Sequence, residues 1–210
     1  MDILTVKKYV AAGAAVALLG LQSLSGQTFV EKKDAFQRSY VQEATGDYIK
    51  AIASLKAVYE EDSYETNLRL GWLTYLSGNF TEAKAYYNRS INLMPFSIEA
   101  RYGLIYPAAA MGNWSEVMVQ YEKILETCPN NSYAMHRLGL IYYGREEYDR
   151  ALKLFEKVVN LYPFDYDGLS MLAWTNFKLN NLREAKILFQ KALLNTPNGT
   201  SAIEGLDLLK

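Results

Sequence analysis

The sequence is poor in the residues that most often build a reactive or metal-binding centre. It has one cysteine, Cys128, and one histidine, His136, in 210 residues. A disulfide within the chain and a thiol-metal cluster both need at least a second cysteine, and a site of several histidines needs more than one. We therefore predict no metal site, and for Cys128 we favour a packing role at a helix end.

An excess of one charge and a phosphate-binding loop are also missing. The chain carries 22 basic and 23 acidic residues, and its glycines are spread rather than clustered after a strand. A phosphate backbone attracts basic surfaces, so no nucleic-acid partner is expected. Acidic pairs such as Glu60-Glu61 are sequence neighbours near helix ends and do not converge as an acid/base pair would. We predict no catalytic residues, no cofactor and no enzyme activity.

The longest apolar run, from Tyr9 to Leu21, has 13 residues, whereas a helix needs about 20 to span a bilayer. It follows Lys7 and Lys8 and precedes small residues, which is the order of a secretory signal. We predict a signal peptide over 1–26, with cleavage after Ser25 or after Gly26 both open. The mature chain then lacks a membrane span and is periplasmic or secreted; the alternative is an uncleaved anchor.

What the sequence does contain is a period of 34 residues. Proline, aromatic and leucine positions all keep it, at Pro95, Pro129, Pro163 and Pro197; Tyr87, Tyr121, Phe155 and Phe189; and Leu70, Leu104, Leu138 and Leu172. Apolar residues within a unit recur at helical spacing, so each unit is predicted to be a pair of amphipathic helices. Turns such as Gly78-Asn79 are expected to use a left-handed glycine followed by a capping Asn or Asp.

These residues resemble the tetratricopeptide repeat family, most closely in Leu138-Gly139, Ala151, Phe155 and Pro163. The resemblance implies an all-α, right-handed α-solenoid of helix-turn-helix units with a C-terminal capping helix. The limits of the expected units are 32–63 (divergent), 64–97, 98–131 (divergent), 132–165 and 166–199, with the cap at 200–210. In the divergent third unit Ile105 and Val117 stand where the family prefers Gly and Ala, and Pro107 is expected to kink its first helix, either widening a groove or without function.

The family's architecture also implies which residues face a partner, because the first helices of successive units line a concave face. Carried over by position, the partner-binding residues are Phe36, Tyr40, Trp72, Tyr75, Tyr102, Tyr106, Tyr133, His136, Tyr143, Trp174 and Phe177. Aromatic side chains are common anchors of protein interfaces. The opposing interpretation is that about half of these rings pack between neighbouring helices as core.

We therefore predict an exported, bacterial-type scaffold that binds a protein or peptide segment on an aromatic concave face. Two alternatives stay open: a receptor for a small molecule or glycan in the same groove, and a self-associating structural module. The sequence leaves the oligomeric state undetermined.

Overall fold

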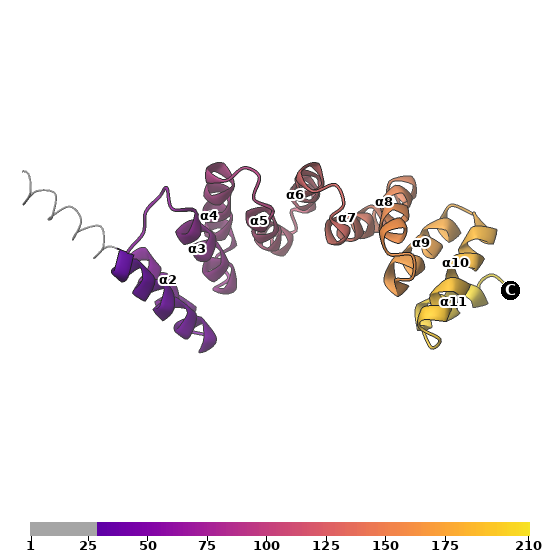
Figure 1. Cartoon of the computed structure of the whole chain (residues 1–210), viewed down its shortest axis with the longest axis horizontal. Helices are drawn as coiled ribbons and strands as arrows, with labels where there is room; N and C mark the ends of the chain where they lie inside the picture. Colours follow the sequence, from indigo (N-terminus) through magenta and orange to yellow (C-terminus); the bar gives the residue numbers. More distant parts are fainter. Residues whose placement is uncertain (1–28) are drawn as a thin grey trace, which may run out of the picture. The chain divides into compact units, whose positions relative to one another are not determined.

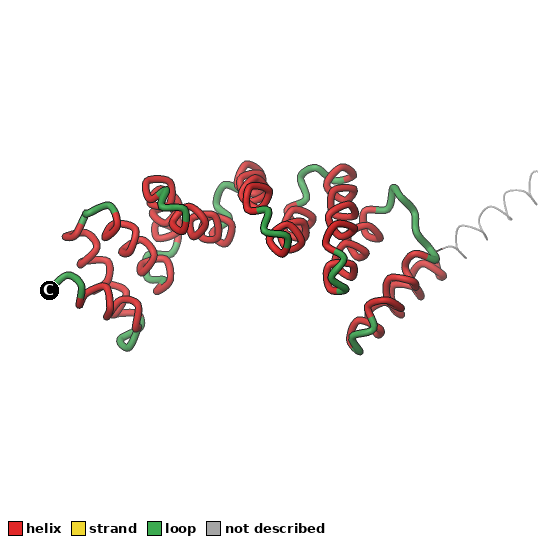
Figure 2. Tube along the Cα trace, turned by 180° about the vertical axis from the view of Figure 1, so that it is seen from behind, coloured by secondary structure: helices red, strands yellow, loops and turns green. Residues whose placement is uncertain are grey.

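The computed structural model describes residues 29–210, which form helices joined by turns without a strand (Figures 1 and 2). The predicted signal peptide, 1–26, lies outside these residues. The chain comprises two compact units that divide between Pro95 and Phe96. The predicted all-α fold of consecutive helix-turn-helix pairs is confirmed.

The first unit consists of a helical segment at 29–44 followed by α2 (Tyr48–Lys56), α3 (Tyr64–Leu76) and α4 (Phe80–Leu93). Helices α3 and α4 form an antiparallel pair (Figure 1). Their core includes Leu55, Leu70 and Leu73, all fully buried. Leu55 comes from α2, and Leu70 and Leu73 lie three residues apart on α3, so apolar side chains between adjacent helices hold the unit together.

The second unit runs from α5 to α11 and has one continuous apolar core. Its helices are α5 (Ile98–Ala110), α6 (Trp114–Thr127), α7 (Ser132–Gly144), α8 (Tyr148–Leu161), α9 (Tyr166–Lys178), α10 (Leu182–Asn195) and α11 (Thr200–Asp207). The last helix packs against α9 and α10, where it covers their apolar side chains. None of the helices in residues 29–210 combines the length and the apolar composition that crossing a membrane requires.

Left-handed residues end the first helix of each pair. Gly78 and Gly112 have φ of 82° and 71°, as expected from the sequence. The next two turns place Glu146 (φ 62°) and Asn180 (φ 63°) in the same conformation, each 34 residues after the previous position. The repeat therefore imposes its turn geometry even on a residue with a Cβ, for which the left-handed region is unfavourable.

Side-chain caps begin the helices, but not all where the sequence suggested. Asn113 accepts from the backbone N–H of Glu116, as predicted, whereas Asn79 makes no cap and its Nδ2 donates to Ser77 Oγ at 3.2 Å instead. A second period of caps, unrecognised in the sequence, precedes the first helices. Each cap accepts from a backbone N–H three residues on, and the residues are Ser63, Ser97, Asn131 and Asp165.

Glycine allows the two helices of a pair to approach closely. A Cβ added at Gly139 of α7 would lie 2.8 Å from Cε1 of Phe155 in α8, and one at Gly71 would lie 3.0 Å from the ring of Tyr87. In the third pair the corresponding residues are Ile105 and Tyr121, and α5 and α6 pack less extensively than α3 with α4, α7 with α8 or α9 with α10. Helix α5 continues through Pro107 to Ala110.

Candidate binding site

The structure sorts the predicted partner-binding residues by exposure. In the first unit Trp72 is half-buried, and its Nε1 donates to Glu43 Oε1 at 2.7 Å. Glu43 also pairs with Arg69 at 2.5 Å, and Arg69 is itself buried. Trp72 therefore belongs to a polar network that fastens α3 to the segment 29–44.

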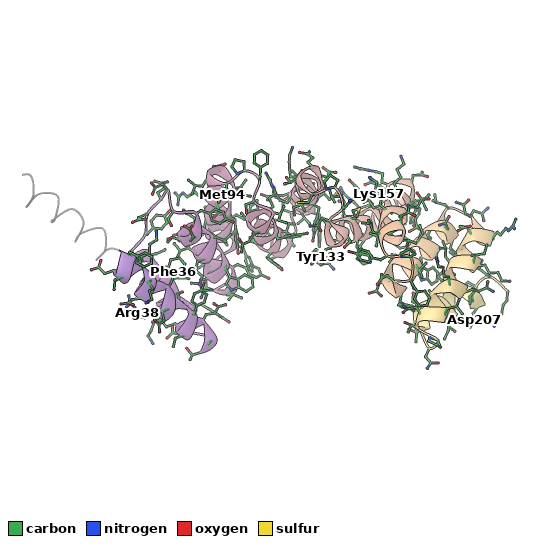
Figure 3. All side chains as sticks on the ribbon, in the orientation of Figure 1. Phe36, Arg38, Met94, Tyr133, Lys157 and Asp207 are labelled. Carbon is green, nitrogen blue, oxygen red and sulfur yellow. The ribbon has the colours of Figure 1, made fainter. Side chains whose placement is uncertain are left out.

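The other predicted residues of the first unit also have partners within it. Phe36, labelled in Figure 3, packs against the apolar core. The ring of Tyr40 is exposed, but Arg69 lies over one face with its Cζ 3.9 Å from the ring centroid. Tyr75 lies between Trp72 and Phe80, with ring centroids 5.7 and 5.8 Å away. These rings contribute to packing as much as to an accessible surface.

Tyr143 of α7 and the rings of Trp174 and Phe177 in α9 are likewise half-buried. Trp174 donates from Nε1 to Ser201 Oγ at 2.8 Å and packs on Phe177, with ring centroids 5.6 Å apart. Tyr143 packs edge-on against Tyr148 at 5.4 Å. Trp174 thereby joins α9 to α11, so its first role is structural.

His136 lies in α7, edge-on to the buried ring of Phe155 with centroids 5.7 Å apart. Burial lowers its pKa, and the nearby carboxylates of Asp167 and Asp165 only partly oppose this. Within the described chain Nε2 of His136 is buried without a hydrogen-bond partner. The neutral imidazole is therefore favoured, and among residues 29–210 no group of acidic, cysteine and histidine side chains is arranged to hold a metal.

Three predicted residues gather at one place in the second unit. Tyr102 of α5 lies 5.6 Å from Tyr133 of α7 and 6.4 Å from Tyr121 of α6, as ring centroids, and Tyr106 follows Tyr102 by one turn of α5. We call these four residues the tyrosine cluster. Tyr106 and Tyr133 are 47% and 55% exposed, while Tyr121 is buried. The cluster thus presents two accessible rings on a packed base, and Figure 3 labels Tyr133 on α7.

A hydrogen bond orders the cluster. The Tyr102 hydroxyl donates to Asn131 Oδ1 at 2.9 Å, and the same oxygen accepts from the backbone N–H of Ala134 at 2.9 Å. Asn131 is thus both the N-cap of α7 and the anchor of Tyr102. Burial raises the pKa of Tyr102 and of Tyr121, so both hydroxyls are protonated at neutral pH.

Beside the cluster lies a cavity of about 480 Å³ between α5, α6 and α7. Its apolar lining includes Ile105, Val117, Leu140 and Ile141, and Tyr121 is shared with the cluster. Arg137 of α7 and Arg145, which directly follows α7, also line it, as does the exposed indole of Trp114. The sequence-based site included none of these lining residues; the signal for the cavity was Ile105 and Val117 in place of Gly and Ala.

A family model described as a tetratricopeptide repeat matches residues 132–165, and another of the same description matches 64–96 and 166–198. A human protein, Protein O-mannosyl-transferase TMTC1, is 32% identical over 119 residues. The matched region is 57% of this chain but 13% of that protein. This chain therefore corresponds to a small part of that relative.

Solved structures share the fold. A tetratricopeptide repeat protein from Parabacteroides merdae ATCC 43184 superposes with a TM-score of 0.72 at 20% identity, covering 85% of this chain and 72% of that one. YrrB, described as a TPR protein with an unusual peptide-binding site, superposes with a TM-score of 0.67 at 15% identity, covering 82% of this chain and 90% of that one. At these identities the likeness concerns the fold alone.

Proposed function

Because this chain is a tetratricopeptide repeat protein, we propose that it is a protein-interaction module that binds a protein or peptide segment through exposed aromatic side chains of its first helices. The observation that carries the proposal is the tyrosine cluster. Two of its rings are accessible, and both belong to first helices, which the family resemblance leads us to expect on the partner-binding face. Of the eleven predicted residues, Tyr106 and Tyr133 are the ones we assign first to contact.

The packing of the cluster supports a role as a preformed anchor. Tyr102 is fixed by Asn131, and its ring contacts that of Tyr133. A tyrosine that is already ordered loses little side-chain entropy on binding, and its ring and hydroxyl offer apolar and polar contact together. The partner expected from this chemistry is an extended segment that places an apolar or aromatic side chain against the two rings. A peptide-binding site is also named for YrrB, whose fold is shared.

The test compares the variant Tyr106→Ser/Tyr133→Ser with the control Tyr162→Ser, which changes a tyrosine that is 53% exposed in the second unit but lies outside the cluster. Partners are recovered by crosslinking in the native compartment and quantified by mass spectrometry. Removing two central aromatic anchors costs roughly 2 kcal/mol or more, so recovery of a direct partner should fall at least tenfold. Unchanged recovery with the folded double variant would refute the proposed surface. Trp72 and Trp174 are less suitable targets because their indoles also hold helices together.

We also propose that the protein is exported and that it has no catalytic activity. Tetratricopeptide repeats are generally scaffolds without catalysis, and the signal-like order of 1–26 supports export to the periplasm or beyond. N-terminal sequencing of the protein recovered from cell fractions tests this: a start near residue 26 or 27 is expected, and an intact N-terminus in the cytoplasmic fraction would contradict it. Self-association is a separate possibility, for which light scattering at high concentration is the test.

A receptor for a small molecule is the second candidate, favoured by the cavity between α5, α6 and α7.

A further inference from the structure

We propose that the cavity between α5, α6 and α7 binds a small carboxylate with an aromatic or aliphatic body, received by Arg137 and the Tyr121 hydroxyl. The proposal names a ligand class for a site separate from the exposed rings of Tyr106 and Tyr133, and it does not depend on the proposed peptide binding.

The cavity has a local cause in the sequence. In the second and fourth helix pairs a glycine lets an aromatic ring lie against the opposite helix, and an added Cβ would come within 3.0 Å of that ring at Gly71 and within 2.8 Å at Gly139. In the third pair this position is Ile105, so Tyr121 cannot lie against α5 in the same way. Val117 replaces the small Ala83 of the second pair. Two larger side chains thus stand where the other pairs have small ones, and both line the cavity beside α7.

The size and lining of this space suit a small molecule. A volume of about 480 Å³ lies within the range of roughly 300–1,000 Å³ that is usual for ligand sites. Ile105, Val117, Leu140 and Ile141 form apolar walls, and Trp114 adds an aromatic surface. Such a lining gains free energy when an apolar body replaces water.

The positive charges of the residues that line the cavity favour an anionic ligand. Along α7, Arg137, the pair Leu140 and Ile141, and Arg145 follow at helical spacing, so two guanidinium groups flank an apolar stretch of one helix face. Among residues 29–210 neither arginine lies within ion-pair distance of a carboxylate. Arg145 donates from Nη1 to the thioether of Met118 at 2.7 Å, and a thioether is a weak acceptor. The cavity therefore has a surplus of positive charge beside apolar walls.

Arg137 is the group that we assign to the carboxylate. Arg137 and Tyr121 both line the cavity, so a guanidinium N–H and a phenolic O–H are available there to donate to one carboxylate. Arg145 stands at the C-terminal end of α7, where the helix dipole disfavours an anion. It contributes a weaker, longer-range attraction.

The probes are phenylacetate, 4-phenylbutyrate, indole-3-propionate and octanoate, each paired with its uncharged primary amide and titrated into the full chain by ligand-observed NMR and calorimetry. At least one acid should bind, and its amide should bind roughly tenfold more weakly because the charge-assisted hydrogen bonds are lost. Equal binding of acid and amide, or no binding by any of the four acids, would overturn the proposal.

Variants locate the site. Gly144 ends α7 and lines the cavity, and no atom lies within 4 Å of a Cβ added there. Gly144→Phe should therefore fill the space without strain and abolish binding, while the matched Gly144→Ala should bind as the wild type does. Unchanged affinity in Gly144→Phe would place the ligand elsewhere.

Charge variants test the assignment. Arg137→Gln should weaken binding at least tenfold and Tyr121→Phe by a few-fold, whereas the control Lys157→Gln, on α8 (Figure 3), removes one positive charge outside the cavity and should have no effect. If Arg137→Gln and Lys157→Gln weaken acid binding equally, the effect comes from the net charge of the protein and the proposed site is refuted.

The variant Tyr106→Ser/Tyr133→Ser should still bind the acid. A failure of the peptide proposal can therefore be distinguished from a failure of this one. A peptide that ends in tryptophan is titrated in the same way. If that peptide binds and none of the four free acids does, the proposal of a small-molecule ligand is contradicted.

Discussion

Replacing Gly139 with alanine tests the close packing of a glycine against an aromatic ring that the second and fourth helix pairs share. The new Cβ would lie 2.8 and 2.9 Å from two atoms of the Phe155 ring, well inside the roughly 3.5 Å at which carbon atoms begin to repel. Phe155 is fully buried and its ring packs edge-on against His136, so it has no free space to move into. Overpacking of this kind costs about 1–3 kcal/mol.

The matched control is Gly144→Ala in the same helix, where the added Cβ meets nothing within 4 Å. Alanine gains up to about 1 kcal/mol of helix propensity at Gly139 and less at Gly144, the last residue of α7, so a lower stability of Gly139→Ala reports the steric conflict with Phe155. We expect Gly139→Ala to be less stable than Gly144→Ala by about 1–3 kcal/mol.

Urea unfolding followed by far-UV circular dichroism measures this difference as a shift in midpoint at unchanged slope. Hydrogen exchange should place the loss of protection at α7 and α8. Equal midpoints for the two variants would show that Phe155 adjusts freely, and would refute the account of both the regular pairs and the cavity, since the cavity is attributed to the absence of this close approach.

Three further predictions concern the turns, the histidine and the polar network. Glu146→Gly should raise the free energy of unfolding by roughly 0.5–1 kcal/mol, because the left-handed conformation disfavours a residue with a Cβ, and Asn180→Gly should gain less because asparagine tolerates that conformation; urea midpoints give both values. Burial lowers the pKa of His136, so the unfolded chain binds a proton more readily than the folded chain as the pH falls through about 6.5. Stability should consequently decrease from pH 7.5 to 6 in the wild type, and His136→Phe should lose that part of the dependence in urea titrations at each pH. Trp72→Phe removes the hydrogen bond to Glu43 and should cost about 1 kcal/mol, measured by thermal unfolding, and an unchanged stability would contradict a structural role for the indole.

The local structure followed closely from the sequence because it depends on short-range chemistry. Glycine at 78 and 112 ends a first helix in the left-handed conformation as expected, and the 34-residue register of apolar residues predicts the pairs that the chain forms. The caps at Ser97, Asn131 and Asp165 are also spaced by 34 residues, so the repeat of the sequence is sufficient to predict them. The failure at Asn79 shows the limit: Ser77 competes for its side chain, and a repeat pattern does not decide between two local hydrogen bonds.

The candidate site depended on contacts that no periodic pattern contains. Trp72, Tyr106 and Trp174 occupy the same position of their units, yet the two indoles donate to Glu43 and Ser201 while Tyr106 is 47% exposed. These partners are 29 and 27 residues away in the chain, and only packing brings them within reach.

The sequence by itself determined the helix pairs, their turns and the presence of aromatic residues on the first helices, because period, capping and propensity act within a few residues. The tertiary structure decided which of those rings are accessible and where a cavity opens. Both outcomes depend on how neighbouring helices pack, and at the third pair the side chains of Ile105, Val117 and Tyr121 line the cavity together.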